Sequence, residues 1–394
     1  MVILICNAGS TSLKFKLWDM PGERVLCAGR VERVGTDEAI FGYDCAEKSV
    51  KIEEGDLSIR DYTAGISRFL SCMTDREVGA VKALDQVDAV GFKTVLCKGV
   101  SGTRVIDAQV IAGMEAYYPV APAHNGPYLE AIRVFQKLLA DKPLVGAFET
   151  AFHETIPRYR RLYGVPYEWI ERYGIMKMGF HGASHSYIAE KMLGVRRVIS
   201  CHLGGSSSLC AILDGKSVDN TLGFSMQTGL MHNNRVGDLD AYVILYLMKM
   251  GVAPEEIDRQ LTEQAGLKGI SGTSGDMRDV IRAMAQGSER AQLAFDMLAD
   301  AIRRYIGAYT VEMGGLDAIV FTGGIGENCW QLRAKVLEGL GCLGVEMDAA
   351  KNQGARGEAT ISKEGAKVLV RVIPANEELM VVRRTCECLK QRTQ

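Results

Sequence analysis

The sequence predicts an α/β protein made of two related halves, and three observations point to this fold class. Short apolar runs typical of strands alternate with longer helical patterns along the 394 residues. A turn of small residues followed by an alternating strand occurs twice, as CNAGSTSLKFKLWDM at 6–20 and as CHLGGSSSLCAILDG at 201–215. The chain is also long enough to form two domains.

Composition narrows the possible classes of function. Hydrophobic residues make up 47% and charged residues 24% of the chain, and the net charge of −2 gives no overall attraction to nucleic acid or to a membrane. No apolar run approaches the roughly 20 residues of a membrane-spanning helix, and the first residues lack a basic leader. The 11 cysteines include no CxxC pair, which favours free thiols in the cytoplasm over a structural zinc site.

The first half is expected to open with strands. Residues 2–6 are continuously apolar, and Leu13, Phe15 and Leu17 then alternate with lysines, as in a half-buried strand. The expected elements are strands at 2–6, 13–17, 25–31 and 86–91 and helices at 60–74 and 127–140.

The second half repeats this opening. A strand at 198–201, a Gly-Ser turn and a strand at 209–213 precede Asp214-Gly215, which predicts a hairpin turn. Asn328 is expected to cap the helix that follows GGIGEN. The other expected elements are helices at 238–250, 253–264, 276–286, 289–314 and 376–391 and strands at 316–321 and 368–373.

The repeated opening suggests a duplicated domain with a cleft between the halves, with chance similarity of two β-hairpins as the alternative. Turns of small residues at 7–12, 204–208 and 322–328 could hold phosphate, because small side chains let backbone N–H groups approach an anion. The GxGxxG fingerprint fails at Asn328, and no GxxxxGK[ST] motif occurs. Together these turns indicate a nucleotide held between the halves.

All six histidines lie between residues 124 and 232. His181 and His185 have the spacing of a helical metal pair, but Gly182 rather than Glu follows His181, so the zinc-protease pattern fails. Histidines at a polar cleft are favoured over a zinc site, and hydrogen-bonded core histidines are the alternative.

Eight motifs resemble, in order and rough spacing, those of the acetate kinase family (acetate/propionate kinase-like), of which this chain looks like a divergent member. They are NAGSTSLKF, APAHN, GFHGASHSYIAEK, CHLGGSSSL, VDNTLGF, SGDMRD, FTGGIGEN and IPANEELM. The resemblance implies the duplicated actin/hexokinase/Hsp70-type (ASKHA) fold, with an N-terminal half at 1–153 plus 379–394 and a nucleotide-binding half at 154–378. It also implies reversible transfer of the γ-phosphoryl group of ATP to a short-chain carboxylate, with Mg²⁺ or Mn²⁺, in a cytoplasmic homodimer.

A carboxylate acceptor is already ionised at pH 7, so its attack needs positive charge and hydrogen-bond donors rather than a general base. The resemblance implies catalytic roles for Arg235, His181, Glu149 and Lys93 and metal-site roles for Glu377, Asn7 and Glu149. ATP or ADP is expected at Asn7, Ser10, Ser12, Lys14, His202, Gly204, Gly205, Asp276, Arg278, Gly324, Ile325 and Asn328. The acceptor is expected at Lys93, Val95, Ala123, His124, Phe180 and Met226.

Three departures from the family pattern affect residues that are expected to take part in the reaction. Lys93 replaces an arginine that holds the substrate carboxylate, Glu149 replaces an aspartate, and Gly205 replaces a phosphate-contacting asparagine in the family's HLGNG. The family's EGLVMGTRSGD reads TGLMHNNRVGD here, which places His232, Asn233 and Asn234 before Arg235. With the smaller Ala123 and the flexible Met226, these residues predict a reshaped acceptor site.

Two interpretations therefore compete. In the favoured one, the chain is an active carboxylate kinase whose acceptor is not simply acetate. In the other, it is a catalytically impaired relative that binds nucleotide and has a regulatory role. Phosphoryl transfer from another donor such as pyrophosphate is a third reading, against which SGDMRD and GGIGEN argue.

Overall fold

The computed structural model describes residues 1–393, and the chain folds as two compact units. Unit 1 consists of Met1–Ala151 and the C-terminal segment that begins at Glu377, and unit 2 consists of Phe152–Asn376. These bounds differ by a few residues from the expected division at 1–153 plus 379–394 and 154–378.

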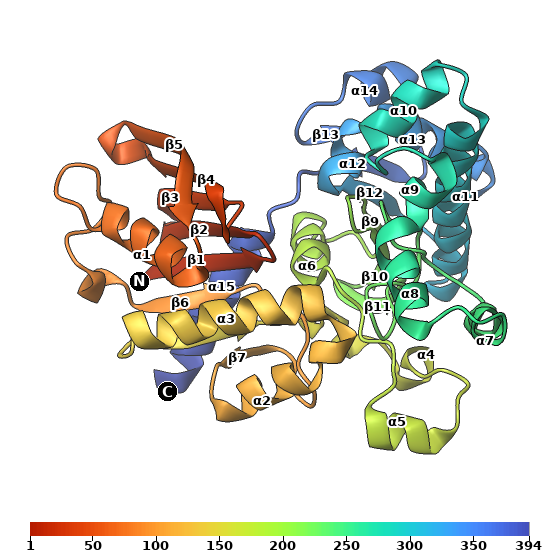
Figure 1. The fold of residues 1–394 in the computed structure, drawn as a ribbon. Helices are drawn as coiled ribbons and strands as arrows, with labels where there is room; N and C mark the ends of the chain where they lie inside the picture. The colour runs from red at the N-terminus through yellow and green to blue at the C-terminus, as the bar shows by residue number, and fades with distance from the viewer. Residues whose placement is uncertain (394) are drawn as a thin grey trace. The chain divides into compact units, whose positions relative to one another are not determined.

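Unit 1 is built on a mixed sheet of eight strands in the order β5-β4-β3-β2-β1-β6-β8-β7 (Figure 1). Strands β1, β6 and β8 run parallel, and the other neighbouring pairs are antiparallel. The strands span β1 (Val2–Gly9), β2 (Ser12–Asp19), β3 (Arg24–Glu32), β4 (Thr36–Cys45), β5 (Val50–Ile59), β6 (Ala89–Phe92), β7 (Thr103–Val105) and β8 (Leu144–Ala147).

Helices cover both faces of this sheet. On one face, Phe69 of α1 stacks on Phe15 of β2. On the other face, α15 lies so close to β6 that a Cβ at Gly91 would come within 2.6 Å of the Thr385 hydroxyl. The helices of unit 1 are α1 (Tyr62–Met73), α2 (Ala108–Ala116), α3 (Pro122–Leu138) and α15 (Glu377–Thr393).

Unit 2 is built on a sheet of six strands in the order β11-β10-β9-β12-β14-β13. Its strands span β9 (Arg197–His202), β10 (Ser208–Leu213), β11 (Lys216–Asn220), β12 (Ala318–Thr322), β13 (Ala359–Thr360) and β14 (Leu369–Val372). Its helices span α4 (Arg158–Arg161), α5 (Tyr167–Tyr173), α6 (Gly182–Lys191), α7 (Ala241–Lys249), α8 (Pro254–Arg259), α9 (Gly266–Ser271), α10 (Met277–Ala285), α11 (Glu289–Glu312), α12 (Gly323–Asn328), α13 (Trp330–Leu337) and α14 (Ala349–Gly354).

The two sheets share one connectivity. The order β3-β2-β1-β6-β8-β7 in unit 1 corresponds to β11-β10-β9-β12-β14-β13 in unit 2, with the same parallel and antiparallel pairs. Ser12 begins β2 and Ser208 begins β10, which are the positions that the sequence repeat matches. The shared topology favours duplication over chance similarity of two hairpins and confirms the predicted α/β fold with related halves.

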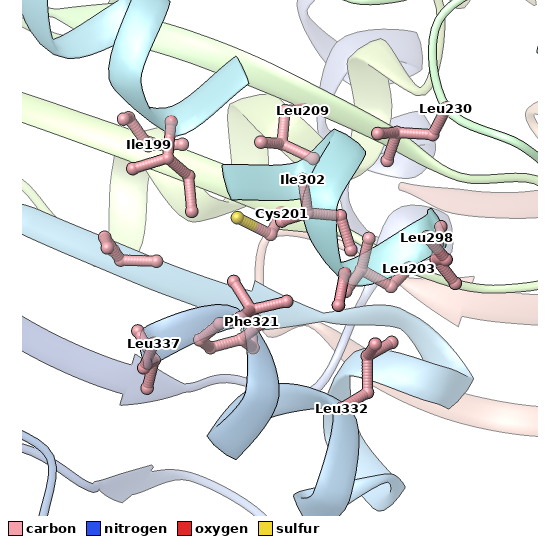
Figure 2. Packing of buried hydrophobic residues seen from close by; sticks show 14 of the residues in the cluster. Ile199, Cys201, Leu203, Leu209, Leu230, Leu298, Ile302, Phe321, Leu332 and Leu337 are labelled. Atoms are coloured by element: carbon pink, nitrogen blue, oxygen red, sulfur yellow. The ribbon is translucent and has the colours of Figure 1, made fainter. Parts of the chain in front are cut away.

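The core of unit 2 forms because successive strand residues point to opposite faces of the sheet. Ile199 and Phe321 pack with Ile302 of α11 on one face (Figure 2). Val198 and Val320 face the other side, in the cluster that includes apolar residues of α6. Burial on both faces explains why the central strand β12 is apolar from Ala318 to Phe321.

Some elements differ from the sequence-based expectation. The helix expected at 127–140 begins at Pro122 and contains Pro127, and the helix expected at 253–264 is α8 followed by a π-helical turn at Gln260–Gln264. The expected helix cap at Asn328 is wrong. Asn328 ends α12 and its Nδ2 donates to the Gly324 carbonyl, so Cys329 takes the N-cap position of α13. No helix within residues 1–393 is both long and apolar enough to cross a membrane.

Candidate active site

A cluster of one lysine and two glutamates lies in unit 1. Lys93 directly follows β6 and Glu149 lies just beyond β8, so these parallel strands carry both residues at their carboxyl ends. Glu377 is the first residue of α15. The Lys93 Nζ lies 2.5 Å from Glu377 Oε2 and 3.8 Å from Glu149 Oε1. The side chain of Glu149 is only 5% exposed, so its charge is largely removed from water.

This cluster holds Lys93 in its charged form. Burial alone would lower the pKa of Lys93, but the Glu377 and Glu149 carboxylates raise it above its usual range. The structure therefore joins Lys93 to two carboxylates of its own chain. An ammonium group is a point charge and does not form the two parallel hydrogen bonds that an arginine forms with a carboxylate.

The first turn of small residues joins β1 to β2. Asn7 lies opposite Lys14 in this antiparallel pair, which places both side chains on the same face of the sheet. The Asn7 Oδ1 accepts a hydrogen bond of 2.6 Å from the Tyr128 hydroxyl of α3. Ser10 and Lys14 are exposed and Ser12 is half-buried. The turn therefore presents hydroxyl and ammonium donors at the end of β1.

Three histidines of unit 2 lie close together, and a serine links two of them. The Ser208 Oγ lies 2.8 Å from both His181 Nδ1 and His185 Nε2, and Ser200 Oγ lies 2.9 Å from His185 Nδ1. The ring centroids of His181 and His202 are 4.3 Å apart. Ser208 thus links the half-buried His181 to a buried histidine behind it.

The buried His185 of this cluster is held in its neutral form. Burial lowers the pKa of His185 well below its usual range, and His153 and His202 act in the same direction. The backbone of His181 has a φ of 56°, in the left-handed region that residues other than glycine rarely adopt, and such strain is concentrated at functional sites. Within the described residues 1–393, no group of three or more His, Cys, Asp or Glu side chains could hold a metal ion.

Arg235 lies in the long segment between β11 and α7. Its Nη1 donates a hydrogen bond of 2.7 Å to the Met226 carbonyl. Burial lowers the pKa of Arg235 to about 10, which leaves the guanidinium charged at neutral pH. Nearby, His232 Nδ1 accepts a hydrogen bond from the Ser207 backbone, and burial together with Arg235 lowers the His232 pKa to about 3. His232 is therefore neutral and buried, and it holds the Ser207 backbone rather than contacting a carboxylate substrate.

A hollow of about 740 Å³ in unit 2 brings together many of the residues expected to bind nucleotide, and this volume suits a small-molecule site. Asp276 caps α10, and the Arg278 guanidinium donates to both oxygens of the Asp276 carboxylate, which lowers the pKa of Asp276 to about 2. The lining includes Gly204, Gly205, Asn233, Asp276, Arg278, Gly324, Ile325 and Asn328. Asn233, expected near the acceptor, thus lies among the residues expected to bind nucleotide.

The residues expected to bind the acceptor belong to both units. They are Lys93, Val95, Ala123 and His124 of unit 1 and Phe180 and Met226 of unit 2. Val95, Phe180 and Met226 are buried, whereas Ala123 is exposed and lines a surface hollow with Ser10.

Glu149 and Glu377 are chemically suited to Mg²⁺, which proteins hold through one or two carboxylates together with substrate phosphates. The position that both carboxylates share in this structure carries the Lys93 ammonium. A positive charge is therefore already stabilised there, and the residues fit a phosphate-bound Mg²⁺.

Sequence reasoning missed several supporting residues. Ser208 was part of the sequence repeat, and His185 was paired with His181 by its spacing, but only as a candidate metal ligand and not through a shared serine. Tyr128, which holds Asn7, gave no signal, because a tyrosine on an apolar helix face is an ordinary core residue.

Comparisons with known proteins identify the family of the chain. The family model described as the Acetokinase family matches residues 2–383. The acetate kinase of Clostridium novyi is 39% identical over 400 residues, covering 99% of each chain, and that of Shouchella clausii is 41% identical, covering 97% of this chain and 98% of the relative. The crystal structure of Porphyromonas gingivalis acetate kinase superposes with a TM-score of 0.88 at 36% identity, covering 98% of this chain and 99% of the other. That of a Francisella tularensis propionate kinase gives 0.89 at 32% identity, covering 97% and 98%.

Proposed function

The chain belongs to the acetokinase family and has its duplicated actin/hexokinase/Hsp70-type fold, and on this premise we propose how it works as an ATP-dependent carboxylate kinase. It transfers the γ-phosphoryl group of ATP to a short-chain carboxylate and gives an acyl phosphate, in a reversible reaction. Its preferred acceptor is larger or more polar than acetate.

The observation that carries this choice of acceptor is the pairing of Lys93. Its ammonium lies 2.5 Å from Glu377 and 3.8 Å from Glu149. Its charge is therefore already paired, and a lysine cannot form two parallel hydrogen bonds with a substrate carboxylate. An acceptor with further polar groups would gain hydrogen bonds elsewhere that acetate cannot make.

The charged groups of the chain have distinct roles in this proposal. Arg235 remains protonated at neutral pH, and its planar guanidinium stabilises the oxygens of the phosphoryl group in transfer. His181, oriented by Ser208, donates to the same group. Glu149, Glu377 and Asn7 would hold Mg²⁺, which would neutralise phosphate charge when bound. ATP occupies the hollow lined by Asp276, Arg278 and the turn of α12.

The proposal is tested by measuring ADP release from Mg-ATP with acetate, propionate, butyrate and hydroxy-, amino- and branched acids, with trapping of the acyl phosphate by hydroxylamine. We expect kcat/KM for one larger or polar acid to exceed that for acetate at least tenfold. Acetate as the best acceptor would overturn the altered specificity and leave the kinase activity. Nucleotide binding without turnover of any acid would favour the regulatory alternative.

We also propose that the protein is a cytoplasmic homodimer. Helix α7 is apolar along its length and exposed, with Tyr242 at 75% and Tyr246 at 60% exposure, and a second copy of the chain is the partner that would cover it. All 11 cysteines are free, as expected in a reducing compartment.

A further inference from the structure

Two serines and two histidines of unit 2 form one chain of hydrogen bonds. The Ser200 Oγ lies 2.9 Å from His185 Nδ1, and the His185 Nε2 lies 2.8 Å from Ser208 Oγ. The same Ser208 Oγ lies 2.8 Å from His181 Nδ1. Ser200, His185 and Ser208 are all 0% exposed. Bulk water therefore cannot supply partners for their polar hydrogens, and the chain has to share its hydrogens internally.

The number of hydrogens in this chain is limited. A serine hydroxyl has one hydrogen to donate, and a neutral imidazole has one N–H and one acceptor nitrogen. Burial lowers the pKa of His185 well below its usual range, so His185 carries a single N–H at neutral pH. Within the described residues 1–393, the Ser200 hydroxyl contacts only His185, and the Ser208 hydroxyl contacts only His185 and His181.

One assignment gives every buried hydroxyl hydrogen an acceptor. The Ser200 O–H donates to His185 Nδ1, because it has no other acceptor. The single N–H of His185 is then on Nε2 and donates to the Ser208 Oγ. The Ser208 O–H therefore donates to His181 Nδ1, which has to be unprotonated. Any reversal along the chain, or an imidazolium at His181, leaves a buried hydroxyl hydrogen without an acceptor and so costs free energy.

We propose that this chain fixes the tautomer of His181, with Nδ1 as the acceptor and the proton on Nε2. Ser200, His185 and Ser208 are positioning residues, because they act through His181 rather than on the substrate. A neutral His181 then presents an N–H, and not a lone pair, to the negative oxygens of the phosphoryl group in transfer. The inference rests on the proposed role of His181 and deepens it, since it names the donating nitrogen and the residues that keep the proton there.

Nitrogen-15 NMR of the full chain, labelled at histidine, tests the tautomer directly at pH 7.5. A ring nitrogen without a hydrogen resonates far downfield of one that carries a hydrogen, and His181→Gln identifies the His181 signals by their loss. We expect His181 to be neutral with its hydrogen on Nε2. A hydrogen on Nδ1, or on both nitrogens, would overturn the proposal in the wild-type protein itself.

Ser200→Ala tests the far end of the chain. Without the Ser200 hydroxyl, either assignment leaves one nitrogen of His185 unpaired, so the two tautomers of His181 should become comparable in population. We expect kcat to fall in proportion to the fraction of His181 that keeps its hydrogen on Nε2, about twofold for equal populations, while the Kd for ADP changes less than that. Ser200→Thr keeps the hydroxyl and should restore both the tautomer and kcat.

Ser217→Ala is the matched control. Ser217 is also fully buried and lies 2.8 Å from the Nδ1 of a histidine, but that histidine is His153, outside the chain. This variant should keep the wild-type tautomer of His181. A His181 that keeps its hydrogen entirely on Nε2 in Ser200→Ala would show that the chain does not set the tautomer. A wild-type protein with the expected tautomer that forms no acyl phosphate would instead contradict the proposed function, so the two failures are distinguishable.

Discussion

The ammonium of Lys93 lies between the carboxylates of Glu377 and Glu149, so at the scale of single residues its loss should have two consequences. Lys93→Met leaves two nearby carboxylates uncompensated and should lower the free energy of unfolding by about 1–3 kcal/mol, reduced from the range for fully buried pairs because the side chains are partly exposed. Added Mg²⁺ should then stabilise the variant more than the wild type. Thermal unfolding with and without MgCl₂ measures both effects.

Lys16→Met is the control for this experiment. Lys16 pairs with Glu378, the residue next to Glu377, but its side chain is 39% exposed. We expect a change below about 1 kcal/mol and no greater response to Mg²⁺ than in the wild type. If Mg²⁺ stabilised neither Lys93→Met nor the wild type, the two carboxylates would not bind the metal.

Arg235 is expected to act on the transition state rather than on nucleotide affinity. Arg235→Lys keeps the charge but loses the planar fork, so kcat should fall on the order of a hundredfold while the Kd for ADP stays within about threefold. Steady-state kinetics and ADP titration separate the two quantities. A variant that turns over like the wild type would remove Arg235 from the mechanism.

Single residues of the site were predictable to different degrees. Asp276, Gly324 and Asn328 come from distant segments, and the motif resemblance named them before the structure brought them to one hollow. The pairing of Lys93 with Glu377 was not predictable, because it joins the residue after β6 to the start of α15, and the two are far apart in sequence. Asn233 was expected near the acceptor because it lies close to Arg235 in the sequence. This expectation failed because closeness in sequence does not determine which way a side chain points.

At the scale of elements, α6 and the strands β9 and β10 are tied together by neutral histidines. The folded-state pKa of His185 lies well below that of an unfolded histidine, so between pH 6.5 and the folded pKa only the unfolded chain takes up the proton. Stability should therefore fall as the pH drops below about 6.5, and His185→Gln should remove about 1.4 kcal/mol per pH unit from that slope. Urea unfolding at pH 7.5, 6.5 and 5.5 provides the measurement.

His232 should contribute a similar acid sensitivity, because its folded pKa is about 3. The slope that remains in His185→Gln is therefore expected to be positive rather than zero. An unchanged slope in that variant would mean that His185 takes up its proton without unfolding.

The elements themselves were predicted best where their pattern was strong. The apolar runs of β1 and β12 and the long periodicity of α11 were expected close to their observed positions. Strand β5 escaped prediction because it is a largely exposed edge strand with mostly polar residues. Strand β8 has only four residues and no turn signal of its own.

At the scale of the whole molecule, the exposed face of α7 predicts self-association. Replacing Tyr242 and Tyr246 with Glu should turn the proposed dimer into a monomer, because charged side chains would have to be buried in the interface. Sedimentation velocity measures the change in mass. Leu193→Glu is the control, since Leu193 is 89% exposed on unit 2 outside α7, and it should leave the dimer intact. A wild-type monomer at micromolar concentration would contradict the proposal.

The return of α15 to unit 1 has a consequence for synthesis on the ribosome. Met1–Ala151 leaves the exit tunnel before any residue of unit 2. Helix α15, which covers one face of the unit 1 sheet, starts only at Glu377. At roughly 5–20 residues per second, the nascent N-terminal sheet waits on the order of ten to fifty seconds with one apolar face uncovered. Lys93 meets Glu377 only after that delay, so the nascent chain gains this charged cluster only after Phe152–Asn376 have been synthesised and have had time to fold.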